Sequence, residues 1–138
     1  MKKRFVSAFL LVLMILTTVM PAAQASEIQP RYIGISQVTV SLDIDSTVVG
    51  ENLASCLGFV ALYDGYSADV KLSLQRSTNK TSWTNVKSWE ASGEEEVRIT
   101  EEYFVLKDYY YRVNILVYVY YESGSLAEIV TKNSAVLP

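Results

Sequence analysis

The segment YYYRVNILVYVYY, residues 109–121, constrains the fold most strongly, because two kinds of side chain alternate along it. In an extended strand, successive side chains point to opposite faces. The odd positions place four aliphatic side chains on one face, and burying each is worth roughly 1.5–3 kcal/mol. The even positions carry Arg112 and Asn114, which cannot be buried without partners at acceptable cost. We therefore predict a strand with a buried odd face. That face comprises Tyr109, Tyr111, Val113, Ile115, Val117, Val119 and Tyr121.

The same alternation recurs along the rest of the chain, with Gly, Ser and Asn turn signals between the runs. After residue 26 there is no 3.6-residue apolar pattern long enough for a helix. Repeated short strands with such turns are typical of an antiparallel sandwich or a small barrel. We predict an all-β fold, an antiparallel β-sandwich of about seven strands. The other predicted strands are residues 36–44, 51–63, 68–77, 83–91, 97–105 and 126–135.

The N-terminal residues have the layout of an export signal. An apolar run at residues 5–20 follows a basic start at residues 2–4, and its 16 residues fall short of the roughly 20 that a membrane helix needs. Ala23 and Ala25 supply the small residues that a signal peptidase requires. We expect a signal peptide over residues 1–25 that is cleaved before Ser26, with an uncleaved N-terminal anchor as the alternative.

Cleavage at this position would leave residues 26–138 as a single β-sandwich domain. The chain has 12 Lys+Arg and 15 Asp+Glu, and three of the basic residues but none of the acidic ones precede residue 26, so the remainder carries a net charge of −6. Such a chain repels phosphate backbones and anionic lipids, so we expect no nucleic-acid partner and no membrane insertion. The expected location is secreted and extracellular, or periplasmic if the host has an outer membrane.

Two stretches resemble fibronectin type III and related immunoglobulin-like sandwiches. VKLSLQRSTNKTSWTNVKSW, residues 70–89, is similar to their hairpin of a strand, a short polar loop and a Trp-bearing strand. YYYRVNILVYVY, residues 109–120, is similar to the strand whose opening tyrosine makes a tyrosine corner. The resemblance implies that Tyr109 or Tyr111 donates a hydrogen bond to the backbone near residues 106–108. It also extends to short exported bacterial proteins of unknown function, and it is silent on activity.

The outward face of residues 109–121 is the candidate binding surface. It carries Tyr110, Tyr118 and Tyr120 beside Arg112 and Leu116. Tyrosines offer rigid contact area with polar tips, which suits protein partners and sugar rings. Equally, aromatic cross-strand pairs stabilise a sheet by roughly 0.2–1 kcal/mol each without any ligand. The predicted function is a secreted, non-enzymatic interaction or structural module whose partner is an extracellular protein, a second copy of the chain or a cell-surface glycan.

The two tryptophans bear on the alternative function. Trp83 and Trp89 lie six residues apart and share parity, whereas Val86 has the opposite parity. A regular strand cannot bury all three on one face, so a bulge or a loop-to-strand transition is predicted between them. Packing in the core is the simpler role for both rings. If Trp83 faces outward it joins the tyrosine face, and a carbohydrate-binding module using these aromatics is the alternative function.

Other chemistry is poorly represented in the sequence. Asp43 and Asp45 are weak candidates for a calcium site, because they lack the EF-hand spacing and ordinary solvated carboxylates explain them. The chain has no histidine, which excludes Ser–His and Cys–His nucleophile pairs and the usual zinc sites. No catalytic residue, metal or cofactor is therefore assigned. A small secreted hydrolase using paired carboxylates is the lesser alternative. Cys56 is expected to be a small buried hydrophobe, and the alternative, an intermolecular disulfide or a reactive thiol, would require exposure and a nearby cation.

Overall fold

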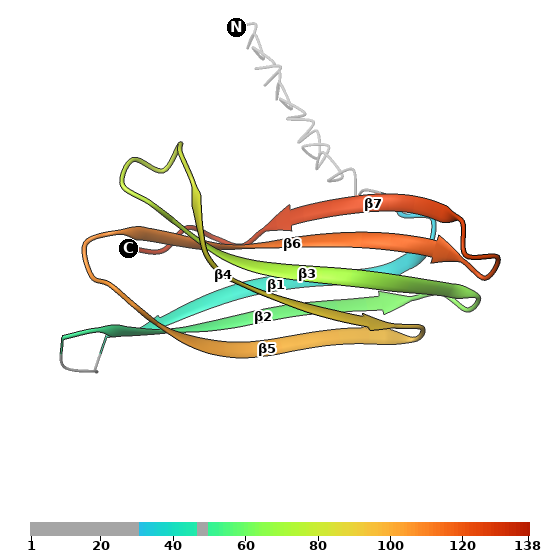
Figure 1. Cartoon of the computed structure of the whole chain (residues 1–138), viewed down its shortest axis with the longest axis horizontal. Helices are drawn as coiled ribbons and strands as arrows, with labels where there is room; N and C mark the ends of the chain where they lie inside the picture. Colours follow the sequence, from blue (N-terminus) through green and yellow to red (C-terminus); the bar gives the residue numbers. More distant parts are fainter. Residues whose placement is uncertain (1–30, 47–49) are drawn as a thin grey trace, which may run out of the picture.

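The computed structural model describes residues 31–46 and 50–138, so the predicted signal peptide and its cleavage residues Ala23, Ala25 and Ser26 lie outside the described residues. Within the described ranges the chain contains seven strands and no helix (Figure 1). No helix in this part is long and apolar enough to cross a membrane. The strands are β1 (Ile35–Asp45), β2 (Asn52–Leu62), β3 (Tyr66–Ser77), β4 (Thr84–Gly93), β5 (Glu96–Val105), β6 (Tyr110–Tyr121) and β7 (Leu126–Asn133).

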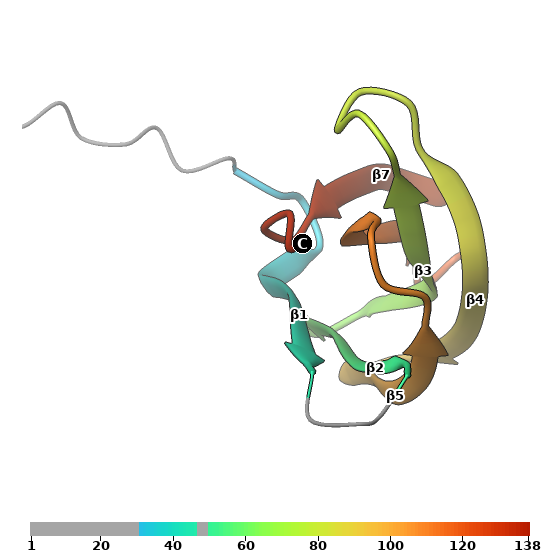
Figure 2. The same cartoon turned by 90° about the vertical axis from the view of Figure 1, so that its left-hand side faces the viewer.

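The strands form two facing sheets, and every pairing is antiparallel. One sheet has the order β1-β2-β5 and the other the order β4-β3-β6-β7. At one side of the molecule β4 lies beside β5 of the opposite sheet (Figure 2). The prediction of an all-β sandwich of about seven antiparallel strands is confirmed.

The core lies between the sheets, and the inward face of β6 is its centre. Each of the four predicted aliphatic side chains of this face is 0% exposed, and Tyr111 is 2% exposed. The predicted parity is thus confirmed from Tyr111 to Val119, but it fails at both ends of the predicted segment. Tyr109 precedes the strand and is half-buried, and Tyr121 is 40% exposed because it lies at the β6–β7 turn. The buried residues on this face are Tyr111, Val113, Ile115, Val117 and Val119.

Gly58 of β2 lies close to side chains of the opposite sheet. A Cβ built at this position would lie 2.7 Å from Cδ1 of Leu72 on β3 and 3.2 Å from Cδ1 of Ile115 on β6. Cys56 lies one inward position away on the same strand and is 1% exposed. The expectation that this cysteine is buried is therefore confirmed.

The connection from β5 to β6 is closed by a tyrosine hydroxyl. Tyr111 donates a hydrogen bond of 2.7 Å from Oη to the backbone oxygen of Leu106. Between them, Asp108 adopts a left-handed conformation with φ of 70°. The predicted hydrogen bond to residues 106–108 is thus present, and Tyr111 rather than Tyr109 makes it.

The predicted irregularity between the two tryptophans is also present. On β4, Lys87 pairs with Leu74 and Asn85 pairs with Gln75, so Val86 is an extra residue in the ladder. Because of this bulge, the two rings lie on opposite sides of the sheet. Trp89 pairs with Leu72 and packs on the core, whereas Trp83 lies in the loop before β4.

The edge strands carry charged side chains that point inward. Glu128 of β7 accepts hydrogen bonds from the backbone nitrogens of Ile33 and Gly34, at 2.9 and 2.8 Å. On the same strand, Nζ of Lys132 donates to the backbone oxygen of Val38 at 3.3 Å. On β5, Glu101 pairs with the buried Cys56 and so shares the inward face, yet it is exposed. Inward-pointing charges of this kind disfavour edge-to-edge pairing between molecules.

Candidate functional site

The predicted binding residues of β6 all lie on the outer face of the four-stranded sheet, but they are covered to different extents. Tyr118 is 37% exposed, whereas the other four are half-buried. Tyr110 and Tyr120 are therefore less accessible than the alternation of the sequence predicts. The half-buried residues are Tyr110, Arg112, Leu116 and Tyr120.

At one end of this face, a stacked cluster covers the aromatic rings. Cζ of Arg112 lies 4.3 Å from the ring centroid of Trp83. Nε of Arg112 donates to Oε1 of Gln75 at 2.8 Å, and Nε2 of Gln75 donates to Oδ1 of Asn85 at 2.8 Å. The structure thus brings Trp83 to the tyrosine face, as the alternative reading required, but a guanidinium occupies one face of its ring.

Tyr110 is covered in a similar way by the β3–β4 loop. Nζ of Lys80 lies 4.4 Å from the centroid of the Tyr110 ring. The loop is fixed by Ser77, whose Oγ accepts hydrogen bonds from the backbone nitrogens of Asn79 and Lys80. The rings of Trp83 and Tyr110 therefore each have a cation against one face, which removes that face from stacking on a ligand.

The middle of the outer face is a ladder of polar pairs. Ser73 and Ser88 share a hydrogen bond of 2.9 Å between their hydroxyls. Nδ2 of Asn114 donates to Oγ1 of Thr131 at 3.0 Å and to Oδ1 of Asn133 at 2.8 Å. These groups satisfy one another across β4, β3, β6 and β7, so this part of the face presents few unused hydrogen-bonding groups to a ligand.

The other end of the face is apolar. In the ladder between β6 and β7, Tyr118 pairs with Ile129 and Tyr120 pairs with Leu126. Leu126 is 50% exposed and Ile129 is 55% exposed. With Leu116 these four residues form what we call the β6–β7 patch. Sequence reasoning found the three β6 residues and missed the two on β7. Leu126 and Ile129 share a face because of a bulge at residue 127, which no sequence pattern predicts.

The phenol of Tyr120 is perturbed by its position beside β3. Loss of hydration raises its pKa, and the charge of the nearby Asp69 carboxylate raises it further.

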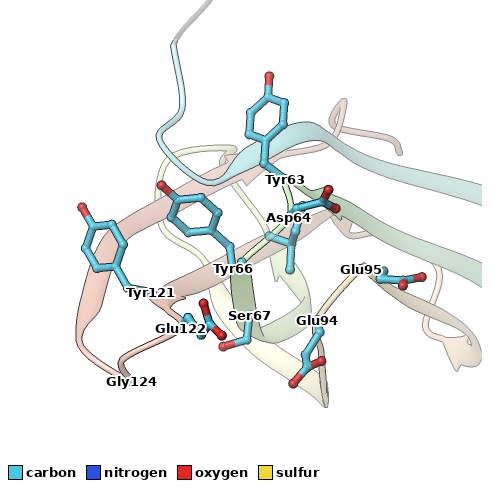
Figure 3. Close-up of a pocket in the computed structure, with 11 residues that line it drawn as sticks. Tyr63, Asp64, Tyr66, Ser67, Glu94, Glu95, Tyr121, Glu122 and Gly124 are labelled. Carbon is cyan, nitrogen blue, oxygen red and sulfur yellow. The ribbon is translucent and has the colours of Figure 1, made fainter.

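A second candidate site lies where three turns meet at one end of the sandwich, and we call it the turn hollow. It has a volume of about 700 Å³ and is formed by the β2–β3, β4–β5 and β6–β7 turns (Figure 3). The three turns lie together at the right-hand end of Figure 1. The hollow is lined by Leu62, Tyr63, Asp64, Gly65, Tyr66, Ser67, Glu94, Glu95, Tyr121, Glu122 and Gly124.

Three tyrosine rings form one side of the turn hollow. Figure 3 shows the rings of Tyr63, Tyr66 and Tyr121 extending to the same side, with carboxylates below and beside them. Tyr63 is 53% exposed, and the centroids of Tyr66 and Tyr121 are 5.6 Å apart. Gly65 and Gly124 make the tight turns possible, because their φ angles of 85° and 86° lie in the left-handed region that favours glycine.

Sequence reasoning did not find the turn hollow. The fragments YDGY and YYESG mark two turns flanked by tyrosines, and they are the sequence signal that could have indicated the site. Which turns come together depends on the pairing of β3 with β6, where Tyr66 pairs with Tyr121. The acidic turn after β4 joins them for the same reason, because β4 pairs with the other edge of β3.

The remaining candidate groups do not assemble into a reactive site. Asp43 and Asp45 lie on the edge strand β1, where they pair with Ser55 and Leu53 of β2. In the described part of the chain, no three His, Cys, Asp or Glu residues are close enough to hold a metal ion. Burial raises the pKa of Cys56 to about 12, so its thiol stays protonated and a poor nucleophile.

Comparison with known proteins adds little. No family model matches the chain, and no curated protein does either. Among solved structures, the chain is similar to a beta-glucosidase from Kluyveromyces marxianus at 17% identity with a TM-score of 0.29. The alignment covers 79% of this chain but 16% of the glucosidase. A similarity of this extent carries no argument about fold or activity.

Proposed function

We propose that this protein is an exported, non-catalytic β-sandwich of fibronectin type III-like kind that binds an extracellular protein through the β6–β7 patch. The signal-like residues 1–25 support export, and the strand order together with the Tyr111 hydrogen bond supports the fibronectin-like assignment. The observation that carries the binding proposal is the exposure of Leu126, Ile129 and Tyr118 beside a polar, internally hydrogen-bonded middle part of the same face.

A protein partner suits the patch better than a sugar does. Two of its exposed side chains, Leu126 and Ile129, are aliphatic and can neither stack flat on a sugar ring nor hydrogen-bond to hydroxyl groups. Protein interfaces, by contrast, combine an apolar centre with a polar rim. Lys71 and Thr131 pair with Leu116 on its two sides and supply such a rim. Carbohydrate binding remains the alternative and would require free ring faces, of which the β6 face offers chiefly that of Tyr118.

Site-specific photo-cross-linking in the native host tests the proposal. The full-length protein would carry p-benzoylphenylalanine at Ile129 or, as a control, at Thr100, which is exposed on β5 of the opposite sheet. We expect a protein adduct from position 129 that is absent from position 100 and is reduced by Tyr118→Ser. Adducts of equal strength at both positions would contradict the proposal.

Two other outcomes would reassign the patch. An adduct of twice the mass of the chain would identify a second copy as the occupant. Glycan-array binding that Tyr118→Ala abolishes without changing the melting temperature, together with no adduct at position 129, would favour the carbohydrate alternative. Export is tested separately by N-terminal sequencing of protein recovered from the medium, where we expect Ser26 as the first residue. Recovery of a chain that begins at Met1 would contradict cleavage.

A further inference from the structure

We propose that the turn hollow binds lysine or arginine side chains of a basic polypeptide segment. The starting observation is a concave site of about 700 Å³ whose wall combines three tyrosine rings with four carboxylates. None of the lining residues is a lysine or an arginine. The site is distinct from the β6–β7 patch, and no step below depends on that patch.

Tyr66 is packed in place beside Tyr121, and Tyr63 is held at its backbone. Tyr66 packs against the core and lies beside Tyr121 with the ring planes tilted by 43°. The backbone of Gly34 approaches the Tyr66 ring so closely that a Cβ there would be 2.6 Å from Cδ1. Tyr63 is fixed through its backbone, whose nitrogen donates to the oxygen of Gly34 at 2.9 Å. Partly exposed tyrosine ring faces attract cations through their quadrupoles.

The carboxylates lack internal counter-charges. In the described part of the chain, the ion pair with a nitrogen–oxygen distance within 4.0 Å joins Lys71 and Glu90. No carboxylate that lines the hollow takes part in it. No basic side chain of the described residues therefore neutralises these carboxylates within this distance, so they can attract a cation from outside the chain. The lining carboxylates are those of Asp64, Glu94, Glu95 and Glu122.

Their spacing selects an extended cation rather than a metal ion. Within the described residues, no three carboxylates are close enough to share a metal. They come from three different turns and lie below and beside the rings (Figure 3). A basic segment fits this arrangement, because its alkyl stems can lie across the rings while its charged ends reach separate carboxylates. The net charge of −6 on residues 26–138 would also steer such a segment toward the chain.

A neutral glycan is a poorer match for the same site. Covering four unpaired carboxylates with an uncharged ligand removes their hydration without supplying a counter-charge. A cationic partner replaces that hydration with direct attraction. Glycan binding at the turn hollow is therefore the outcome that would count against the proposal.

The inference is tested by titration with a capped hexalysine peptide, in which the NMR chemical shifts of the backbone and of the tyrosine rings are monitored. We expect shifts confined to residues 62–67, 94–95 and 121–124, and a several-fold weaker affinity at 150 mM than at 20 mM salt. Hexaglutamate and hexaserine peptides should produce no shifts. No response to hexalysine, or a response to a glycan panel in place of it, would overturn the proposal.

Matched variants separate a built site from general attraction to an acidic protein. Glu122→Gln and Glu102→Gln change the net charge equally, but Glu102 lies on the outer face of β5, away from the hollow. We expect Glu122→Gln to weaken hexalysine binding about two- to fivefold and Glu102→Gln to leave it nearly unchanged. Tyr63→Leu should weaken binding to a similar extent, whereas Tyr63→Phe keeps the ring and should retain affinity. Equal losses from the two glutamate variants would show non-specific binding and refute the site.

Discussion

Removal of the Tyr111 hydroxyl offers a sharp test of how the β5–β6 connection is held. Tyr111→Phe deletes a 2.7 Å hydrogen bond to the backbone oxygen of Leu106 and leaves the buried ring in place. An unpaired buried acceptor costs about 1–3 kcal/mol. Because Leu106 is 51% exposed, its released carbonyl can reach water, so we expect a loss near the lower limit, about 1–1.5 kcal/mol.

The loss converts into a measurable shift in melting temperature. With an unfolding entropy of about 2.1 cal/mol/K per residue, a domain of about 110 residues should melt roughly 4–6 °C lower. Differential scanning calorimetry of the wild type and the variant measures this directly, and urea unfolding gives an independent free energy.

Tyr109→Phe is the matched control for this change. The Tyr109 ring lies edge-on to Tyr111 at 6.4 Å and has Cζ of Arg76 at 4.8 Å from its centroid, and phenylalanine keeps both contacts. We expect a change below about 0.5 kcal/mol, as for substitutions that remove no buried partner. If Tyr109→Phe costs as much as Tyr111→Phe, or if Tyr111→Phe is neutral, the hydroxyl does not hold the connection and the reasoning fails.

Three further predictions concern the core. Burial raises the pKa of Cys56 to about 12 from 9.0, so above pH 9 the unfolded state loses the thiol proton first and stability falls as the pH rises toward 12. The loss should reach about 2 kcal/mol by pH 10.5 in urea unfolding and be absent from Cys56→Ala, and equal pH slopes in the two proteins would contradict it. Gly58→Ala should destabilise the fold by about 1–3 kcal/mol in thermal melts, because the new Cβ would meet the fully buried Leu72 side chain at 2.7 Å. A melting temperature at or above that of the wild type would argue against so close an approach. Ile115→Ala should cost about 2–5 kcal/mol whereas Leu116→Ala, on the outer face of the same strand, should cost less than about 1 kcal/mol, and a reversed order would disprove the assigned faces.

The sequence predicts those parts of the fold that depend on neighbours along the chain. Alternation in β6 identifies the buried positions correctly from Tyr111 to Val119, because a two-residue period fixes which face each side chain takes. The same parity argument predicts a bulge or a loop-to-strand transition between Trp83 and Trp89, and the structure places a bulge at Val86. The argument fails at Tyr121, where the opposite sheet no longer covers the strand.

The candidate sites are less predictable, because they depend on contacts between distant strands. The cover that Lys80 and Arg112 give to Tyr110 and Trp83 comes from a loop conformation, which alternation does not encode. Leu126 and Ile129 have opposite parity and share the outer face through a register shift between β6 and β7. Predicting the turn hollow would require the whole strand order of the sheet. Two of its tyrosines, Tyr66 and Tyr121, are more than fifty residues apart in the sequence.

The path of the last residues determines how the molecule can be anchored for such measurements. The backbone of Leu137 bridges to Tyr111 at the start of β6, whereas the turn hollow lies at the far end of the same strand, beside Tyr121. At about 3.3 Å per residue, those two points are roughly 33 Å apart. A sensor chip or bead coupled through a tag placed after Pro138 would therefore leave the three tyrosines facing the solution, while coupling on the turn side would bury them against the support.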